Sequence, residues 1–373
     1  MDETRVSTLE LFFDLVFVFT ITQLTAVIVH HPNADGLAQV AVLLAIVWWM
    51  YAGYAWLTNS IDLARPSFRL FLLGAMASYL VLALAIPGAF SSTGLTFGLA
   101  YLAIVVLHTG MFTHATSEVS ARSIWSVAQT NLIFAALIVV GGAIGGTAQW
   151  VIWIACAVGL WLVPEIRGIG VFELEPSHFV ERHGLMIMIA LGESVIAIGI
   201  GASALVVNLD LVGTAVLGLL LVAGLAWVHF ADEEGVVGAM RRADHVRRGR
   251  IGVNAFGYCH YVLLFSIVLI AAGLKRATGH PFTEATTFEA VELGAGVALF
   301  LAGDAAFRLA LGIDGARRRA VGAALAPLTI PLGLVAVLLQ IAVLVCLLAA
   351  LVVSRLHQAA PAPRPASPPA PPR

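Results

Sequence analysis

Long apolar runs alternate with short polar connections along this chain. Runs of about 17–25 apolar residues are long enough to cross the hydrocarbon core of a membrane as helices. The pattern predicts twelve crossings, at residues 8–29, 36–58, 67–87, 95–115, 124–141, 147–164, 183–203, 210–230, 251–273, 288–311, 318–333 and 334–354. The last two divide one apolar stretch at Pro327, Pro331 and Gly333, because proline disfavours helix at the residue before it.

The composition supports one membrane-embedded bundle without an appended soluble domain. Hydrophobic residues make up 60% of the chain, charged residues only 11%, and the mean hydropathy is +0.96. Soluble domains carry about 25% charged residues. The net charge of -2 gives no indication of a nucleic-acid partner. We therefore expect an all-α, polytopic transmembrane helical bundle whose main partner is the lipid bilayer.

Basic residues concentrate in alternate connections. The even-numbered connections and their helix ends hold fourteen arginines: Arg65, Arg69, Arg122, Arg167, Arg182, Arg241, Arg242, Arg247, Arg248, Arg250, Arg308, Arg317, Arg318 and Arg319. The odd-numbered connections hold only Lys275 and Arg276, which the pattern leaves unexplained. Lys and Arg are enriched on the cytoplasmic side of membrane proteins. Both termini are therefore expected in the cytoplasm, which requires an even number of helices.

Two pairs of landmarks suggest an internal duplication. Asp14, in ELFFDLVFVF, and Glu193, in IALGESVIAI, are 179 residues apart, and so are Trp48 and Trp227. Six predicted helices separate each pair, so the halves would share one orientation, as in a parallel repeat. Chance similarity between apolar helices is the alternative. The predicted units are a first six-helix half at 1–176, a second at 177–357 and a Pro-rich, disordered cytoplasmic tail at 358–373.

Asp14 and Glu193 are the first candidates for a functional site. An ionisable side chain at bilayer depth costs at least ~2.5–3.5 kcal/mol, so it is a functional-site hypothesis by default. Glu10 lies four residues before Asp14 and shares its helical face. A structural interpretation stays open for each acid. Asp14 and Glu193 would then be hydrogen-bonded between helices, and Glu10 would complete a capping box with Ser7.

A buried Glu193 needs a partner, and the candidates on other helices are His108, His260 and Arg69. Arg182 and His183, ten or more residues away on the same helix, are weaker candidates. A histidine can relay protons or bind metal. For each of them, an ordinary hydrogen-bonded position inside the bundle is the alternative interpretation.

Two further groups have simple structural explanations. Asp304 and Arg308 are an i,i+4 pair that can neutralise each other. An aromatic cluster in the second helix favours an interfacial belt, with a ligand-binding wall as the alternative. It consists of Trp48, Trp49, Tyr51, Tyr54 and Trp56.

Motifs for enzymatic chemistry are absent. The sequence contains no P-loop, no GxSxG elbow, no HExxH and no dinucleotide-binding fingerprint. The three cysteines, Cys156, Cys259 and Cys346, lie within apolar runs and lack the spacing of a zinc site or a disulfide framework. We therefore expect no enzymatic activity, no cofactor and no metal site.

Four stretches carry a resemblance to the low temperature requirement protein A (LtrA) family of bacterial membrane proteins. They are ELFFDLVFVFTITQLT, WWMYAGYAWLTNSID continuing through IPGAF and FGLAYL, ERHGLMIMIALGESVIAIG at 181–199, and ALFLAGDAAFRLALG at 298–312. The resemblance runs from about residue 5 to 355. This chain has Asp304 where the family pattern has His. The resemblance implies a polytopic protein of the bacterial inner membrane linked by name to growth in the cold, and it implies no defined biochemical activity.

Three functions are compatible with these features. The first is transport of a small solute or ion, with Asp14 and Glu193 as titrating or cation-binding groups. The second is a cation channel lined by helices 1 and 7, which usually requires a homo-oligomer. The third is a stress-related membrane scaffold or an intramembrane enzyme. We favour transport, because a duplicated bundle with buried acids and no soluble domain fits it best.

Overall fold

The computed structural model describes residues 6–61, 65–115, 118–167, 174–203, 205–279 and 285–359. The predicted tail at 358–373 lies almost entirely outside the described residues. The described chain is all-α, and eleven of its helices are long and apolar enough to cross a membrane. The predicted fold class, an all-α polytopic helical bundle, is therefore confirmed.

The N-terminal half consists of six long helices and one short 3-10 turn. Local signals explain where they begin. Ser7 and Glu10 form the predicted capping box, Asn33 caps the second helix, and Pro66 opens the third. The elements are α1 Thr8–His30, α2 Ala34–Asn59, α3 Pro66–Ala85, η1 Ile86–Gly88, α4 Gly94–Ala115, α5 Glu118–Ile144 and α6 Gly146–Arg167.

The second half contains further long helices and several short ones. Its elements are α7 Pro176–Ala202, α8 Leu209–Phe230, α9 Glu233–Arg242, α10 His245–Ile251, η2 Gly252–Cys259, α11 His260–Gly279, α12 Thr287–Leu311, α13 Ala316–Leu325, η3 Ala326–Thr329, α14 Ile330–Gly333 and α15 Val337–Ala359. The predicted start of the seventh crossing, residue 183, is wrong. Pro176 occupies the first turn of α7 and the Glu175 carboxylate caps it by accepting from the His178 backbone N–H, so the helix begins seven residues earlier.

The stretch 320–353 is divided into two helical segments near Pro327 and Pro331, as predicted, but only Val337–Arg355 qualifies as a candidate membrane span, so the structure gives eleven candidate spans rather than the predicted twelve. The first segment is broken into α13, η3 and α14, and the second is α15. The broken segment runs back along α12, because Arg319 pairs with Asp304 near one end while the Ala285 backbone N–H donates to the Gly333 carbonyl at the other (3.0 Å). It lies beside the eleven helices that qualify as membrane spans.

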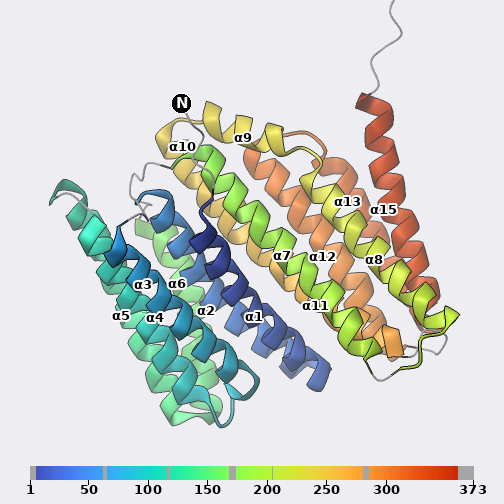
Figure 1. The fold of residues 1–373 in the computed structure, drawn as a ribbon, viewed down its shortest axis with the longest axis horizontal. Coiled ribbons are helices and arrows are strands. Elements are labelled where there is room, and N and C mark those ends of the chain that lie inside the picture. The colour runs from blue at the N-terminus through green and yellow to red at the C-terminus, as the bar shows by residue number, and fades with distance from the viewer. Residues whose placement is uncertain are drawn as a thin grey trace, which may run out of the picture.

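The order in which neighbouring helices pack is similar in the N-terminal and C-terminal halves of the chain. In the first half α1 packs on α3, α3 on α4, α4 on α5, α5 on α6, and α2 on α6. In the second half α7 packs on α11, α11 on α12, α12 on α13, α13 and α14 on α15, and α8 on α15. The halves lie side by side and meet where α1 and α2 contact α7 and α11 (Figure 1).

The two pairs of sequence landmarks do not occupy matching environments. Trp48 is completely buried, whereas Trp227 is 60% exposed. Asp14 lies near the start of α1, whereas Glu193 lies closer to the end of α7 than to its start. The 179-residue offset therefore does not describe equivalent positions, and the duplication itself stays a prediction.

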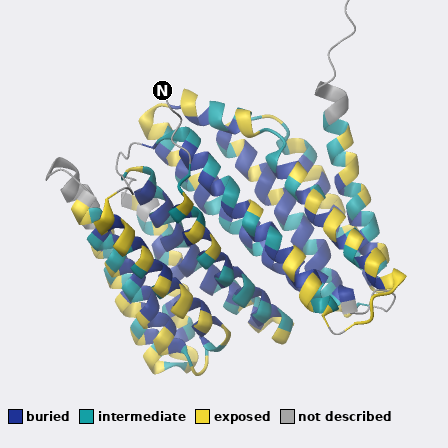
Figure 2. Ribbon diagram, viewed as in Figure 1, coloured by how far each residue is buried: buried dark blue, intermediate teal, exposed yellow. Residues whose placement is uncertain are grey.

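Buried residues follow the inner faces of the helices and exposed ones the outer faces (Figure 2). Many of the exposed residues are apolar, including Leu70, Leu84 and Ile133, as expected of a surface that faces lipid. Small residues permit the closest helix contact. A Cβ on Gly142 of α5 would collide with the carbonyl oxygen of Gly94 at the start of α4, so glycine is required there.

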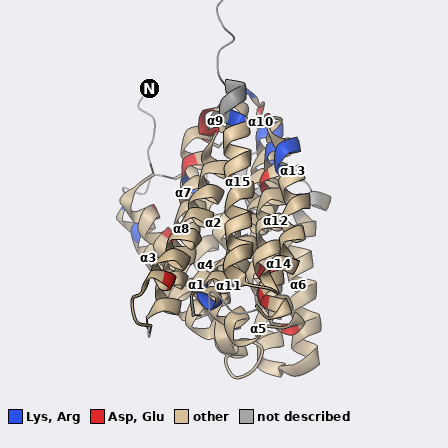
Figure 3. Ribbon diagram, turned by 90° about the vertical axis from the view of Figure 1, so that its right-hand side faces the viewer, with Lys and Arg blue, Asp and Glu red and all other residues tan. Residues whose placement is uncertain are grey.

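Basic residues gather at one end of the bundle, around α9, α10 and α13 (Figure 3). The start of α1 and the end of α15 lie at this same end (Figure 1). At the opposite end, Arg276 pairs with Glu292 and Glu289 and donates to the carbonyls of Ile28 and Val29, the last turn of α1. Arg276 is thus a neutralised C-cap of α1, which explains its exception to the charge pattern.

Candidate functional site

A buried acid–base cluster joins α1 to α7. The Arg182 guanidinium contacts both predicted acids of α1: its Nη1 donates to Glu10 Oε1 (2.6 Å) and its Nη2 to Asp14 Oδ1 (3.2 Å). From α2, the Tyr51 hydroxyl donates to Asp14 Oδ1 (2.7 Å), and Thr58 Oγ1 accepts from Arg182 Nη1 (2.6 Å). Glu10 is 2% exposed, and Asp14 and Arg182 are completely buried.

Parallel packing of two helices produces this cluster. Asp14 meets Arg182 and Glu10 meets His178, both at a separation of 168 residues, and Thr22 meets Glu193 at 171. A nearly constant offset means that α1 and α7 run side by side in the same direction. The two oxygens of the Glu10 carboxylate have different partners. Oε2 accepts a hydrogen bond from the Ser7 backbone N–H (2.9 Å), and Oε1 accepts one from Arg182 Nη1. The capping box predicted for Glu10 is confirmed, and the same carboxylate also takes part in the buried cluster; its role in a functional site stays a prediction.

His178 completes the cluster as a hydrogen-bond donor. Asn59 Oδ1 accepts the Glu175 backbone N–H (2.8 Å), which fixes the orientation of the amide and leaves Asn59 Nδ2 as a donor to His178 Nδ1 (3.0 Å). The proton of the imidazole is then on Nε2, 3.3 Å from Glu10 Oε2. Two carboxylates thus face a single guanidinium in a site closed to solvent.

Two polar atoms of the cluster make no hydrogen bond. Asp14 Oδ2 and Arg182 Nε are buried and lack a hydrogen-bond partner in the described part of the chain. A buried negative charge without compensation costs several kcal/mol. One proton or one small cation would balance the site, and Asp14 Oδ2 is the oxygen left free to take it.

Three buried histidines continue from this cluster into the second half. Tyr51 stacks on Trp48 (ring centroids 4.9 Å), and Trp48 lies parallel to His260 (6.3 Å). His260 contacts His183 (5.5 Å) and His229 (6.1 Å). Each of these side chains is at most 7% exposed.

The tautomers of two of these histidines follow from their backbone contacts. His183 Nδ1 lies 2.8 Å from the Phe179 carbonyl and His260 Nδ1 lies 2.9 Å from the Ala255 carbonyl. Because a carbonyl only accepts, both rings carry a proton on Nδ1, and in the neutral imidazole Nε2 is then the acceptor. His183 Nε2 has no hydrogen-bond partner among the described residues. Two proton acceptors therefore lie close together in the bundle interior.

A π-helical segment precedes His260. In η2 the hydrogen-bond pattern widens, so that His260 Nδ1 reaches back five residues to Ala255 and the Gly257 carbonyl accepts from Trp48 Nε1 (3.0 Å). Such segments are rare and occur frequently at functional sites. Here the segment ties α2 of the first half to α11 of the second.

A second acid–base cluster lies at the end of the histidine series. Asp304 of α12 accepts from His229 Nδ1 (2.8 Å), pairs with Arg319 of α13 and lies 3.6 Å from Arg308. Arg308 also reaches Asp232 (3.4 Å). The predicted Asp304–Arg308 pair is present, but it is one part of a larger network.

Glu193 forms a separate site on α7. Its Oε2 accepts from Thr22 of α1 (2.7 Å), and the side chain is 2% exposed. Within the described ranges, no ion pair and no hydrogen bond joins it to His108 or His260, the predicted partners. His260 belongs to the histidine series, whereas His108 packs on Tyr54 of α2 (5.0 Å).

The sixth candidate, Arg69, lies exposed in the first turn of α3, away from the buried cluster. The predicted aromatic belt is wrong for Trp48, Tyr51 and Tyr54, which are fully buried. They pack on α1 through Phe13 and Phe17, because the α2 face that carries them points into the bundle.

Sequence reasoning missed the roles of Tyr51, Thr58, His178 and His229. Arg182 and His183 were considered only as partners of Glu193, whereas Arg182 serves Glu10 and Asp14. The described residues contain no group of three or more His, Cys, Asp or Glu side chains that could hold a metal ion.

The comparison with known proteins identifies the family. The model of the bacterial low temperature requirement A protein (LtrA) matches residues 5–354. An uncharacterized protein of Rhizobium meliloti (strain 1021) is 28% identical over 319 residues, which cover 81% of this chain and 76% of that protein. All parts of the buried network described above lie within the matched region. The chain therefore belongs to the bacterial LtrA family of multi-pass membrane proteins.

Proposed function

We propose that this protein transports a small solute or ion across the membrane, with the Glu10–Asp14–Arg182 cluster as its titrating or cation-binding site. The observation that carries the proposal is the charge count of a solvent-free site: two carboxylates against one guanidinium, all at most 2% exposed. Such a site binds one proton or cation when it closes and must open to release it. The proposal assigns no chemical reaction to the chain.

The described conformation corresponds to a closed state in this mechanism. Asp14 is fully buried, and α1, α2 and α7 all contribute to its surroundings. Release requires that α1 and α7 separate, which is the rocking of one half against the other that repeat-containing transporters use. The common packing order of the two halves supports a parallel six-helix repeat, because equivalent helices have equivalent neighbours in both.

The histidine series supplies a proton path in this proposal. His183, His260 and His229 lie between the Glu10–Asp14–Arg182 cluster and Asp304. An imidazole can take up a proton on one ring nitrogen and release one from the other, so a series of them can relay protons in either direction. Movement of α7 would change the distance from His183 to His260 and so couple the proton path to the conformation.

The arginine-rich end of the bundle is proposed to face the cytoplasm of the bacterial cell. Basic residues are concentrated there, together with the start of α1 and the end of α15 (Figure 3). A cysteine introduced at Asp35, in the first turn of α2, should then react with a membrane-impermeant maleimide in intact spheroplasts, and one introduced at Glu234 of α9 should react only after permeabilisation. The reverse labelling would contradict this orientation.

Flux in proteoliposomes tests the proposed function. Purified protein is reconstituted with a pH-sensitive dye inside, and an imposed gradient of protons, Na⁺ or K⁺ is followed over time. We expect flux above protein-free vesicles, and we expect Asp14→Asn to abolish it. Asp210→Asn, at an exposed acid in the first turn of α8, is the matched control and should leave flux unchanged. Equal flux in wild type and Asp14→Asn would refute the role of the cluster.

A further inference from the structure

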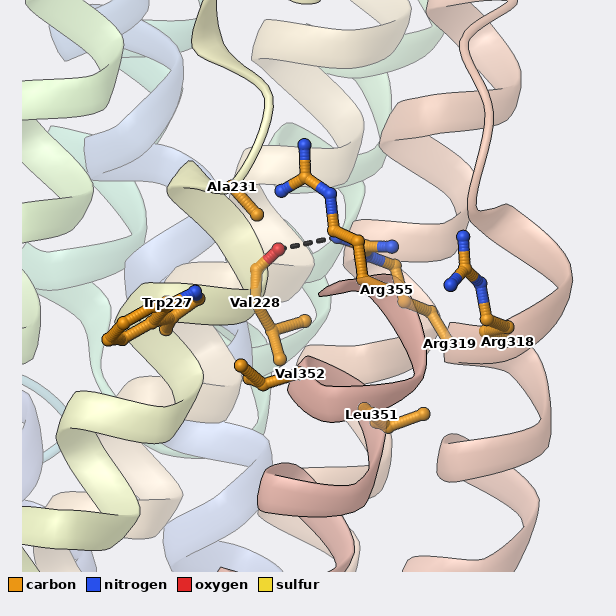
Figure 4. Close-up of a pocket in the computed structure, with 8 residues that line it drawn as sticks. All are labelled: Trp227, Val228, Ala231, Arg318, Arg319, Leu351, Val352 and Arg355. Atoms are coloured by element: carbon orange, nitrogen blue, oxygen red, sulfur yellow. Dashed lines mark hydrogen bonds between the residues drawn. The ribbon is translucent and has the colours of Figure 1, made fainter. Parts of the chain in front are cut away.

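A small cavity at the arginine-rich end is surrounded by basic and apolar side chains from α8, α13 and α15 (Figure 4). It measures about 20 Å³, and Arg318, Arg319, Arg355 and Trp227 contribute to its wall. A wider cleft of about 750 Å³ shares Arg318 and Arg355 with it and adds Arg317 and the carboxylate of Asp314, so three arginines face one acid. Neither space is lined by Asp14 or Glu193, so this site is distinct from the proposed transport site.

The start of α13 carries three successive arginines, and only two nearby carboxylates in the described chain oppose them: Asp304, which pairs with Arg319, and Asp314, which lines the wider cleft. Arg317, Arg318 and Arg319 occupy its first turn, which contains no acidic residue, and Gly315 at the N-cap provides no capping side chain. The N-terminus of a helix already bears a partial positive charge, so cations there are unfavourable and anions are favoured. Three arginines at this position call for an anion.

Internal partners satisfy only part of this charge. Arg319 is engaged by Asp304 and by the Val228 carbonyl (2.5 Å). Arg318, in contrast, has a buried Nη1 without a hydrogen-bond partner among the described residues. Arg355 reaches Asp232 only at 3.9 Å. The cleft therefore contains a guanidinium N–H that is shielded from solvent and lacks an acceptor.

The surroundings of the cleft place it at the membrane surface. Trp227 is 60% exposed and Val321 is 52% exposed. Tryptophan concentrates at the level of lipid headgroups; Trp227 lines the small cavity, and the exposed Val321 of the wider cleft offers a surface for an acyl chain. A soluble anion such as inorganic phosphate would gain nothing from contact with these apolar side chains.

We propose that the cleft binds the phosphate of an anionic membrane phospholipid. Arg318 and Arg355 contact the phosphate oxygens, since guanidinium groups match phosphate geometry and donate charge-assisted hydrogen bonds. The acyl chains lie along Trp227 and Val321. Basic pockets between membrane helices bind anionic headgroups in this way.

The test uses the full-length protein in detergent with dioleoyl phosphatidylglycerol, dioleoyl phosphatidylcholine or inorganic phosphate as the probe. Lipid binding is measured by native mass spectrometry and by the shift of the melting temperature. We expect phosphatidylglycerol to bind and stabilise, while phosphatidylcholine and inorganic phosphate have little effect. Arg318→Gln and Arg355→Gln should each weaken binding by about fivefold, since a basic residue near an anionic headgroup contributes about 1 kcal/mol.

Controls separate a site from general attraction. Arg250→Gln removes an exposed arginine of α10 at the same end of the bundle and should bind as wild type does. Arg318→Lys keeps the positive charge and should retain part of the affinity that Arg318→Gln loses, because the charge and not a general loss of stability determines binding. Equal binding of phosphatidylcholine, an equal loss with Arg250→Gln, or full stabilisation by inorganic phosphate would each overturn the lipid assignment.

Discussion

The Arg182 guanidinium donates to the Glu10 carboxylate over 2.6 Å, and neither side chain is more than 2% exposed. This contact links the first helix of one half to the first helix of the other. A buried ion pair of this kind contributes little net stability but is costly to break on one side. Its position at the meeting of the two halves, together with the second acid Asp14, makes it the centre of the proposed mechanism.

Removal of Arg182 should destabilise the protein strongly. Arg182→Gln leaves Glu10 and Asp14 buried without a cation, and we expect a loss of about 3–5 kcal/mol in the free energy of unfolding. Denaturant titration in detergent measures it. The double variant Glu10→Gln/Arg182→Gln removes one carboxylate as well and should be more stable than Arg182→Gln alone. Additive losses from Glu10 and Arg182 would show that the pair is not coupled.

Close helix packing should make Gly142 intolerant of a side chain. Gly142→Ala forces α4 and α5 apart at the Gly94 carbonyl, and we expect a cost of about 1–3 kcal/mol. Gly192→Ala is the matched control, because its Cβ would meet nothing within 4 Å. Thermal unfolding in detergent compares the two. A stable Gly142→Ala variant would mean that α4 and α5 do not pack as described.

The histidine series should be needed for proton movement. His260→Phe keeps an aromatic ring in place and removes both nitrogens, so we expect proton flux in proteoliposomes to fall by about a hundredfold, the usual scale for a lost proton-transfer group. His114→Phe replaces an exposed histidine of α4 and should leave flux unaltered. Flux in His260→Phe equal to that of His114→Phe would remove the relay from the mechanism.

The behaviour of Glu193 should depend on its hydrogen bond with the Thr22 hydroxyl. Thr22→Val removes the one hydrogen bond that the described structure shows for this carboxylate, at a cost of about 1 kcal/mol. We expect the cation dependence of flux to change in Thr22→Val and in Glu193→Gln alike. Thr113→Val, at an exposed threonine of α4, is the control. Wild-type cation dependence in Glu193→Gln would mean that Glu193 is architectural.

Much of the fold could be predicted because its signals are local. Apolar run length located the spans, Ser7 and Glu10 marked the start of α1, and Pro327 and Pro331 marked the break before α15. The start of α7 was misplaced because the segment with Arg182 and His183 is polar by composition. Pro176 and the Glu175 cap start the helix locally, and the pairing of Arg182 with Glu10 and Asp14 buries this polar segment; hydropathy registers neither signal.

The candidate site was recognised only in part. Glu10 and Asp14 share a helix face, so their proximity followed from the 3.6-residue period. Their partner depends on the register between α1 and α7, which is 168 residues rather than the 179 of the sequence landmarks. Tyr51 was assigned to an interfacial belt because composition cannot tell which face of an aromatic helix is buried.

The flux of protons or cations through the Asp14→Asn variant in proteoliposomes tests most directly the claim that the Asp14 carboxylate carries transport. The substitution keeps the shape of the side chain and its place beside Tyr51 and Arg182, but it removes the carboxylate that takes up the proton or cation. The account predicts measurable flux of protons, Na⁺ or K⁺ in wild type and none in a folded Asp14→Asn protein. Unaltered flux in the variant, or wild-type flux no greater than in empty vesicles, would contradict it.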